Sequence, residues 1–236
     1  MKYAIMKYLK FDDILDFLSR SGMGVFTVYD VAKLMHKPAG YASLLLSKSR
    51  KVRRIERGRY YLDGTSAYEV ASGIVYPSYV SLAAALQYYE LIDQNVVRYS
   101  VITTKRHRRL SLENGDYEFI TVAKRRFFGY ASYGRAYIAT PEKLFVDCLY
   151  FGIPAFSQVE ASFAAALGDN AIDVGRLKRY ALRMGSKALI NRLGFLLELS
   201  GIESDEMLQH TYRSKYVKVR RDTRGKNRKW RVSYDR

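Results

Sequence analysis

The fold is decided by residues 25–62, VFTVYDVAKLMHKPAGYASLLLSKSRKVRRIERGRYYL. Residues 30–35 place apolar side chains at helical spacing, which predicts a short helix. A second helix is predicted over residues 41–49. Pro38 and Gly40 lie between the two, where one helix has to stop and the next has to start. This part of the chain therefore has the pattern of a helix-turn-helix.

Two strands are predicted on the C-terminal side of these helices. Residues 52–55 and 59–62 suit a half-buried ribbon, and residues 56–58 form the turn between them. On the N-terminal side, residues 11–20 form an amphipathic helix, and residues 25–27 can add a strand to the ribbon. This order of elements predicts a winged helix-turn-helix.

The charge of the chain points to a polyanionic partner. Its 236 residues include 40 Lys and Arg against 23 Asp and Glu, which gives a net charge of +17. Such an excess needs a polyanion or a reason to tolerate self-repulsion, and double-stranded DNA is the leading partner. An anionic membrane surface is the alternative, but no apolar run approaches the ~20 residues that span a bilayer. We therefore expect no membrane partner.

Other classes of protein find little support in the sequence. The N-terminal residues lack the features of a signal peptide, and Cys148 has no second cysteine to pair with, so we expect a cytoplasmic protein. His36, His107 and His210 are too far apart for metal-ligand spacing. Phosphate-binding and dinucleotide-binding motifs are missing from the sequence. We expect no enzyme activity, no cofactor and no metal.

The helix over residues 41–49 is the predicted recognition helix. Tyr41, Leu44 and Leu45 are expected to pack inward, which leaves small side chains to enter a major groove. The Lys and Arg side chains that follow are predicted to contact phosphates; the alternatives are a merely solvated charged face and, for the serines, plain solvent exposure. The residues predicted to contact DNA are Ala39, Tyr41, Ser43, Ser47, Lys48, Arg50, Lys51, Arg53, Arg54, Arg57 and Arg59.

The remaining chain is predicted to be an α+β body. The small polar stretch 65–73 suggests a linker, so we divide the chain into a winged-helix domain, 1–70, and a second domain, 71–236. A helix is predicted over residues 80–90, with Ser78 as its cap. The predicted strands span 96–104, 117–122 and 136–139, and the predicted helices that follow span 142–150, 158–167, 174–184 and 187–199, with Ser157, Asp173 and Ser186 as candidate caps.

A basic segment, residues 216–234, predicts a hairpin that turns near residues 224–227. The alternative is a disordered basic tail. Together with two basic runs in the body, this segment could form a second surface for nucleic acid or for a partner. Its candidate residues are Lys105, Arg106, Arg108, Arg109, Lys124, Arg125, Arg126, Lys218, Arg220, Arg224, Lys229 and Arg231.

Four stretches together resemble the AbiEi antitoxin family of type IV abortive-infection toxin–antitoxin systems. They are IVYPSYVSLAAALQYYELI (74–92), VITTKR (101–106), FFGY (127–130) and IATPEKLFVDCLY (138–150). The resemblance extends over about residues 10–150. It implies a phage-defence antitoxin with an N-terminal winged helix, followed by a mixed α/β antitoxin domain with several C-terminal helices.

The resemblance also implies two functions. The winged helix would repress transcription from the protein's own promoter, and Arg53, Arg54, Arg57 and Arg59 would serve promoter binding. The second domain would counter a nucleotidyltransferase-like toxin or protect the toxin's target, through residues that the resemblance does not identify. Two alternatives stay open: a stand-alone transcriptional regulator or chromatin-associated binder, and a nuclease that uses carboxylates brought together by the fold.

Overall fold

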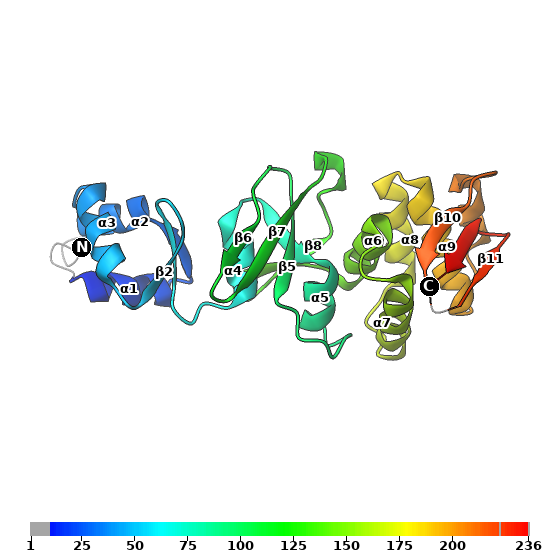
Figure 1. Cartoon of the computed structure of the whole chain (residues 1–236), viewed down its shortest axis with the longest axis horizontal. Coiled ribbons are helices and arrows are strands. Elements are labelled where there is room, and N and C mark those ends of the chain that lie inside the picture. The colour runs from blue at the N-terminus through cyan, green and yellow to red at the C-terminus, as the bar shows by residue number, and fades with distance from the viewer. Residues whose placement is uncertain (1–9, 222, 236) are drawn as a thin grey trace.

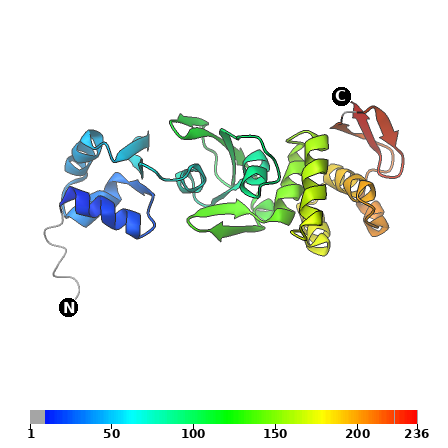
Figure 2. The same cartoon turned by 90° about the horizontal axis from the view of Figure 1, so that it is seen from below.

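A computed structural model describes residues 10–221 and 223–235 of the chain. The molecule is an elongated α+β protein with three parts along its long axis (Figures 1 and 2). The N-terminal part, the head, lies at one end; a sheet with its helices forms the middle; and a helical layer with a small sheet forms the other end. No helix among the described residues is both long and apolar enough to cross a lipid bilayer.

The head has the order of elements that the sequence predicts. Its elements are α1 (Phe11–Arg20), β1 (Val25–Thr27), α2 (Val28–Met35), α3 (Ala39–Lys48), β2 (Val52–Glu56) and β3 (Arg59–Leu62). The strands pair in the order β1-β3-β2, all antiparallel. Thr27 and Asp30 form a capping box that starts α2, with the Thr27 N–H donating to the Asp30 carboxylate at 2.7 Å. Ile14, Val31 and Leu46 are buried in the head core.

The β2–β3 hairpin is packed on both of its faces. Tyr60 lies in the head core, whereas Ile55 and Tyr61 lie in a second core that includes Ile74 and Val101 of the middle part. The stretch expected to be a linker is instead a helix, α4 (Ala67–Ile74), and the linker prediction is wrong. Small and polar residues favoured a linker, but the apolar residues of this helix share the second core, which stabilises the helical conformation.

The middle sheet contains β4 (Ser78–Ser81), β5 (Arg98–Thr103), β6 (Leu110–Leu112), β7 (Gly115–Thr121), β8 (Tyr130–Tyr133) and β9 (Ala136–Ala139). The order is β6-β7-β5-β4-β9-β8, with parallel β5–β7 and β4–β9 pairs. The helix predicted over residues 80–90 begins later than expected, as α5 (Leu82–Tyr88). Ser78 is not its cap: it lies in β4 and donates a hydrogen bond to the Ser72 carbonyl at 3.2 Å.

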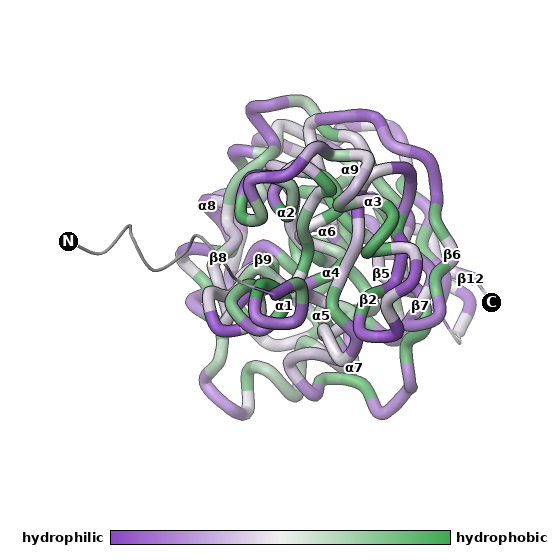
Figure 3. The backbone as a smooth tube through the Cα atoms, turned by 90° about the vertical axis from the view of Figure 1, so that its left-hand side faces the viewer, coloured by the Kyte–Doolittle hydropathy of each residue, from purple (hydrophilic) through white to green (hydrophobic). Residues whose placement is uncertain are grey.

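Four helices form the layer beyond the sheet among the described residues: α6 (Pro141–Phe151), α7 (Phe156–Gly168), α8 (Val174–Met184) and α9 (Lys187–Leu199). Short 3₁₀ helices cover Lys124–Arg126 (η2) and Asp205–His210 (η3). Asp173 and Ser186 cap α8 and α9 as predicted, but Ala155, and not Ser157, precedes α7. Viewed along the long axis, hydrophilic stretches follow the outer loops around the packed helices and strands (Figure 3).

The predicted C-terminal hairpin is wrong in its pairing. The strands are β10 (Val217–Arg220), β11 (Gly225–Asn227) and β12 (Val232–Asp235), in the order β10-β12-β11. β10 pairs with β12 in parallel, whereas β11 and β12 are antiparallel, so the chain turns after Asn227. Trp230 in this turn is fully buried, and its indole N–H donates to Glu198 at 2.9 Å. Burial of this ring against the helical layer fixes the position of the turn.

Candidate nucleic-acid interface

A groove of about 440 Å³ lies between α3 and the β2–β3 hairpin. Ser43 and Ser47 of α3 line one side, and Arg54 and Arg57 of the hairpin line the other. The hairpin turn is held at the start of α2 because the Val28 N–H donates to the Gly58 carbonyl at 2.8 Å. Gly58 has a φ of 76°, a left-handed conformation that glycine adopts without strain. The structure thus brings serines and arginines from separate elements to one concave surface.

The outer face of α3 differs from the prediction. Ala42 and Leu46 are buried, whereas Tyr41 and Leu44, expected to pack inward, are 48% and 50% exposed. The helix is apolar on several sides, so its sequence did not specify which side would meet the core. Ser47 is exposed as predicted and donates a hydrogen bond to the Leu44 carbonyl at 2.9 Å. The outer face therefore offers an aromatic ring and an aliphatic side chain beside the serines.

The hairpin arginines are divided between its two faces. Arg54 is exposed in the groove, where its Nε donates to the Glu56 carbonyl at 3.3 Å. Arg53 lies on the opposite face, with its Nε 3.0 Å from a Glu113 carboxylate oxygen and 3.4 Å from one of Asp63. Its charge is thus compensated by carboxylates of the same molecule. Alternation along a strand explains this division, because successive side chains point to opposite faces.

The other predicted cations differ in their partners. Lys51 forms an ion pair with Asp12 at 2.9 Å, and this hydrogen bond raises the pKa of the Lys51 amino group. Ala39 packs against the head core. Four cations form no ion pair with any residue that the structure describes: Lys48, Arg50, Arg57 and Arg59. With Arg54, these side chains are the uncompensated positive charges of the predicted set.

A basic loop of the middle part lies beside the hairpin. His107 Nε2 is 3.5 Å from a Glu56 carboxylate oxygen, and its ring lies 4.5 Å from that of Phe119. Its neighbours Lys105, Arg106 and Arg108 are exposed. The contact between His107 and Glu56 therefore places this run of cations next to the head, although some 50 residues separate them in sequence.

Other members of the predicted second surface belong to separate elements. Arg109 pairs with Asp116 at 2.9 Å, and hydrogen bonds from Ser111 and Arg109 lower the pKa of that carboxyl. Arg126 donates to the Met184 carbonyl at 3.0 Å and lies over a tyrosine ring. Lys229 pairs with Asp205 at 2.5 Å, and Arg231 lies over the Tyr216 ring. The remaining members are Lys124 and Arg125 in η2, Lys218 and Arg220 in β10, and Arg224 just before β11.

A buried polar cluster joins the sheet to α6. Asp147 accepts hydrogen bonds from Tyr79 at 3.1 Å and from Ser81 at 3.0 Å, and it forms an ion pair with Lys143. Burial raises the pKa of Asp147 and lowers that of Lys143, and the opposite charge of each partner counteracts this. All four side chains are shielded from solvent, so the cluster serves to hold α6 on the sheet. Glu142, which lies in the first turn of the same helix, accepts a hydrogen bond from the Asp173 N–H at 3.2 Å. Residues 10–221 and 223–235 contain no cluster of His, Cys, Asp and Glu that could hold a metal ion.

The comparisons with known proteins bear on the fold. No family model matches the chain, and no curated protein matches it. Among solved structures, the crystal structure of RV2827C protein from Mycobacterium tuberculosis is similar, with a TM-score of 0.64 and 13% sequence identity. The match covers 94% of this chain and 90% of that chain. At this identity the likeness shows that the two chains share a fold over nearly their whole length.

Proposed function

We propose that this protein binds double-stranded DNA through its head, which we interpret as a winged helix-turn-helix. The groove that gathers Ser43, Ser47, Arg54 and Arg57 is the observation that carries the proposal. In this arrangement α3 enters the major groove and its serines meet base edges or phosphates, while Arg57 at the turn reaches the neighbouring backbone or minor groove. The uncompensated cations supply affinity by releasing counterions from the duplex.

The basic loop of the middle part extends this surface. Because His107 contacts Glu56, the exposed Lys105, Arg106 and Arg108 lie on the flank of the hairpin. DNA that runs past the wing would meet their charges next. The protein would then cover more of the duplex than the head alone, and the loop would add salt-dependent affinity without adding base specificity.

We further propose that the DNA is the protein's own promoter and that the protein is the antitoxin of a type IV toxin–antitoxin pair. The resemblance to AbiEi antitoxins supports this assignment through the stretches quoted above, three of which contain β4 with α5, the end of β5 and most of α6. In such a pair, the neighbouring gene encodes a nucleotidyltransferase-like toxin. Co-expression with that gene separates this proposal from a stand-alone regulator, because only an antitoxin restores growth.

The direct test is fluorescence anisotropy with the duplex upstream of the gene and with a scrambled duplex, each over a salt series. We expect tighter binding to the upstream duplex, and a preference that survives moderate salt. The promoter assignment would be wrong if both duplexes bound equally and lost binding at the same salt concentration. Such a result would show that the net charge attracts DNA without regard to sequence.

Substitution of the groove serine Ser43 tests the assignment of α3. Ser43→Leu puts a bulky apolar side chain where the helix backbone has to approach the bases, so specific binding should fall more than binding to scrambled DNA. Ser132→Leu is a matched control, since Ser132 is an exposed serine of β8 in the middle part. An equal loss on both duplexes would show that α3 is not the recognition helix.

A further inference from the structure

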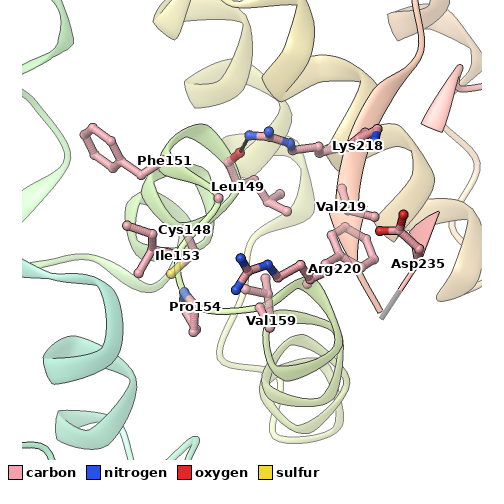
Figure 4. Close-up of a pocket in the computed structure, with 14 residues that line it drawn as sticks. Cys148, Leu149, Phe151, Ile153, Pro154, Val159, Lys218, Val219, Arg220 and Asp235 are labelled. Atoms are coloured by element: carbon pink, nitrogen blue, oxygen red, sulfur yellow. Dashed lines mark hydrogen bonds between the residues drawn. The ribbon is translucent and has the colours of Figure 1, made fainter. Parts of the chain in front are cut away.

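A second cavity lies far from the head, within the helical end of the molecule. Its volume is about 600 Å³, within the range of small-molecule sites. The end of α6 and the loop after it form one wall, with Phe151, Ile153 and Pro154; α7 contributes Phe156 and Val159. β10 closes the other side (Figure 4). The wall formed by α6, its loop and α7 is mostly apolar and offers an organic group a large contact area.

The polar groups of this cavity are mainly positive. Lys218 and Arg220 alternate with Val219 along β10, so both cations are on the same face of the strand, and both line the cavity. Figure 4 shows the Arg220 side chain reaching across the cavity toward Pro154. Neither Lys218 nor Arg220 forms an ion pair with a residue in the described ranges. Asp235 is the acidic residue of the lining, so the positive charges outnumber it.

Arg192 of α9 is the third cation and is held rigidly. Its Nη1 donates to the Leu149 carbonyl at 2.6 Å and to the Tyr150 carbonyl at 3.3 Å, at the C-terminal end of α6. Its Nε is buried and has no hydrogen-bond partner among the described atoms. A buried donor without a partner costs free energy. Burial also lowers the pKa of this guanidinium, and a nearby anion would oppose that shift.

From this arrangement we propose that the cavity binds a small organic anion, with a carboxylate or phosphate head and a flat apolar body. Guanidinium groups match the geometry of carboxylate and of phosphate. Arg192, held by its hydrogen bonds to α6, and Arg220, which extends across the cavity, would bind the anionic head from two sides. The aromatic and branched side chains of α6, its loop and α7 would cover the body. The cavity is separate from the proposed DNA surface, since the head and the helical end lie at opposite ends of the molecule (Figure 1).

Isothermal titration calorimetry on the full chain tests the site with three probes of one shape. Naphthoate and naphthyl phosphate carry the two candidate heads, and naphthalenemethanol carries the same body without charge. We expect at least one anion to bind, with the tighter one identifying the head, and the alcohol to bind about tenfold more weakly or worse. The proposal would be overturned if the alcohol bound as tightly as the anions, or if neither anion bound.

A pair of double variants locates the binding. Lys218→Ala/Arg220→Ala removes two cavity cations, and Arg224→Ala/Arg228→Ala removes two exposed cations that flank β11 and do not line the cavity. The first should weaken anion binding about tenfold or more, and the second should leave it within about twofold. All four side chains are exposed, so both variants should fold, which thermal unfolding checks. Equal losses in the two variants would show that only net charge attracts the anion.

Discussion

The division of the hairpin arginines gives a sharp test of the proposed DNA interface. Arg53 and Arg54 are neighbours in sequence, but Arg53 pairs with Glu113 on the body side while Arg54 lies in the groove. We compare Arg54→Ala/Arg57→Ala with Arg53→Ala. If the groove faces DNA, the first variant loses two phosphate contacts, whereas the second loses an intramolecular ion pair and no contact with DNA.

The expected size of the effect follows from counterion release. Each phosphate contact contributes about 0.9 to the slope of log K against log salt on duplex DNA. Loss of one contact should therefore weaken binding roughly eightfold at about 0.1 M salt, and loss of both should weaken it roughly sixtyfold. The slope should become shallower by about 1.8 for Arg54→Ala/Arg57→Ala and should not change for Arg53→Ala.

Anisotropy titrations of both variants over about 0.05–0.3 M salt, on the upstream and scrambled duplexes, measure these slopes. The groove variant should lose affinity for both duplexes, because phosphate contacts carry no sequence information. Arg53→Ala should instead lower the thermal unfolding temperature slightly, since its ion pair is partly exposed. The same loss of slope for Arg53→Ala and the groove variant would refute the assignment of the groove to DNA.

Three other predictions concern the fold that carries this surface. Ile55→Ala should lower the free energy of unfolding by about 2–5 kcal/mol in urea denaturation, because Ile55 is buried between the hairpin and the body. The control Val97→Ala, at a position that is 65% exposed, should change the free energy of unfolding little. Asp147→Leu leaves the Lys143 amine buried without its partner and should lower the free energy of unfolding by about 3–5 kcal/mol. The double variant Lys143→Met/Asp147→Leu should recover most of that stability, because it also removes the unpaired charge. A double variant no more stable than Asp147→Leu alone would contradict this. Burial raises the pKa of Tyr68 to about 12. The unfolded chain therefore releases the Tyr68 proton at lower pH than the folded chain, so the free energy of unfolding should fall as pH rises from about 10. Tyr68→Phe should reduce that fall.

Local signals in the sequence predicted much of the secondary structure. The bounds of α8 and α9 agree with prediction because Asp173 and Ser186 cap them and Gly185 ends the first of them in a left-handed conformation. The sequence predicts a helix from residue 80 with Ser78 as its cap, whereas Ser78–Ser81 is a strand whose four residues are all buried. A short run that is buried on both faces lacks the alternation that distinguishes a strand from part of a helix.

Long-range pairing is what the sequence could not supply. In β10 the buried Val217 and Val219 alternate with the exposed Lys218 and Arg220, but such alternation carries no information on the parallel pairing of β10 with β12. In the candidate interface, residue type and spacing predict which serines and arginines contact DNA, and this stays a prediction. The pairing of Arg53 with Glu113 could not be predicted, because those residues are 60 positions apart and meet only in the folded chain.

The two-sided packing of the hairpin also limits how such proteins can recombine. A chimera that takes its head from one protein of this fold and its body from another would pack Ile55 and Tyr61 against α4 and β5 side chains of a different sequence. A crossover between β3 and α4 therefore disrupts a packed core, even though it falls in a short loop. If the head binds DNA as proposed, a change of specificity would come through substitutions on the groove side of the hairpin and on α3, with the body side kept constant.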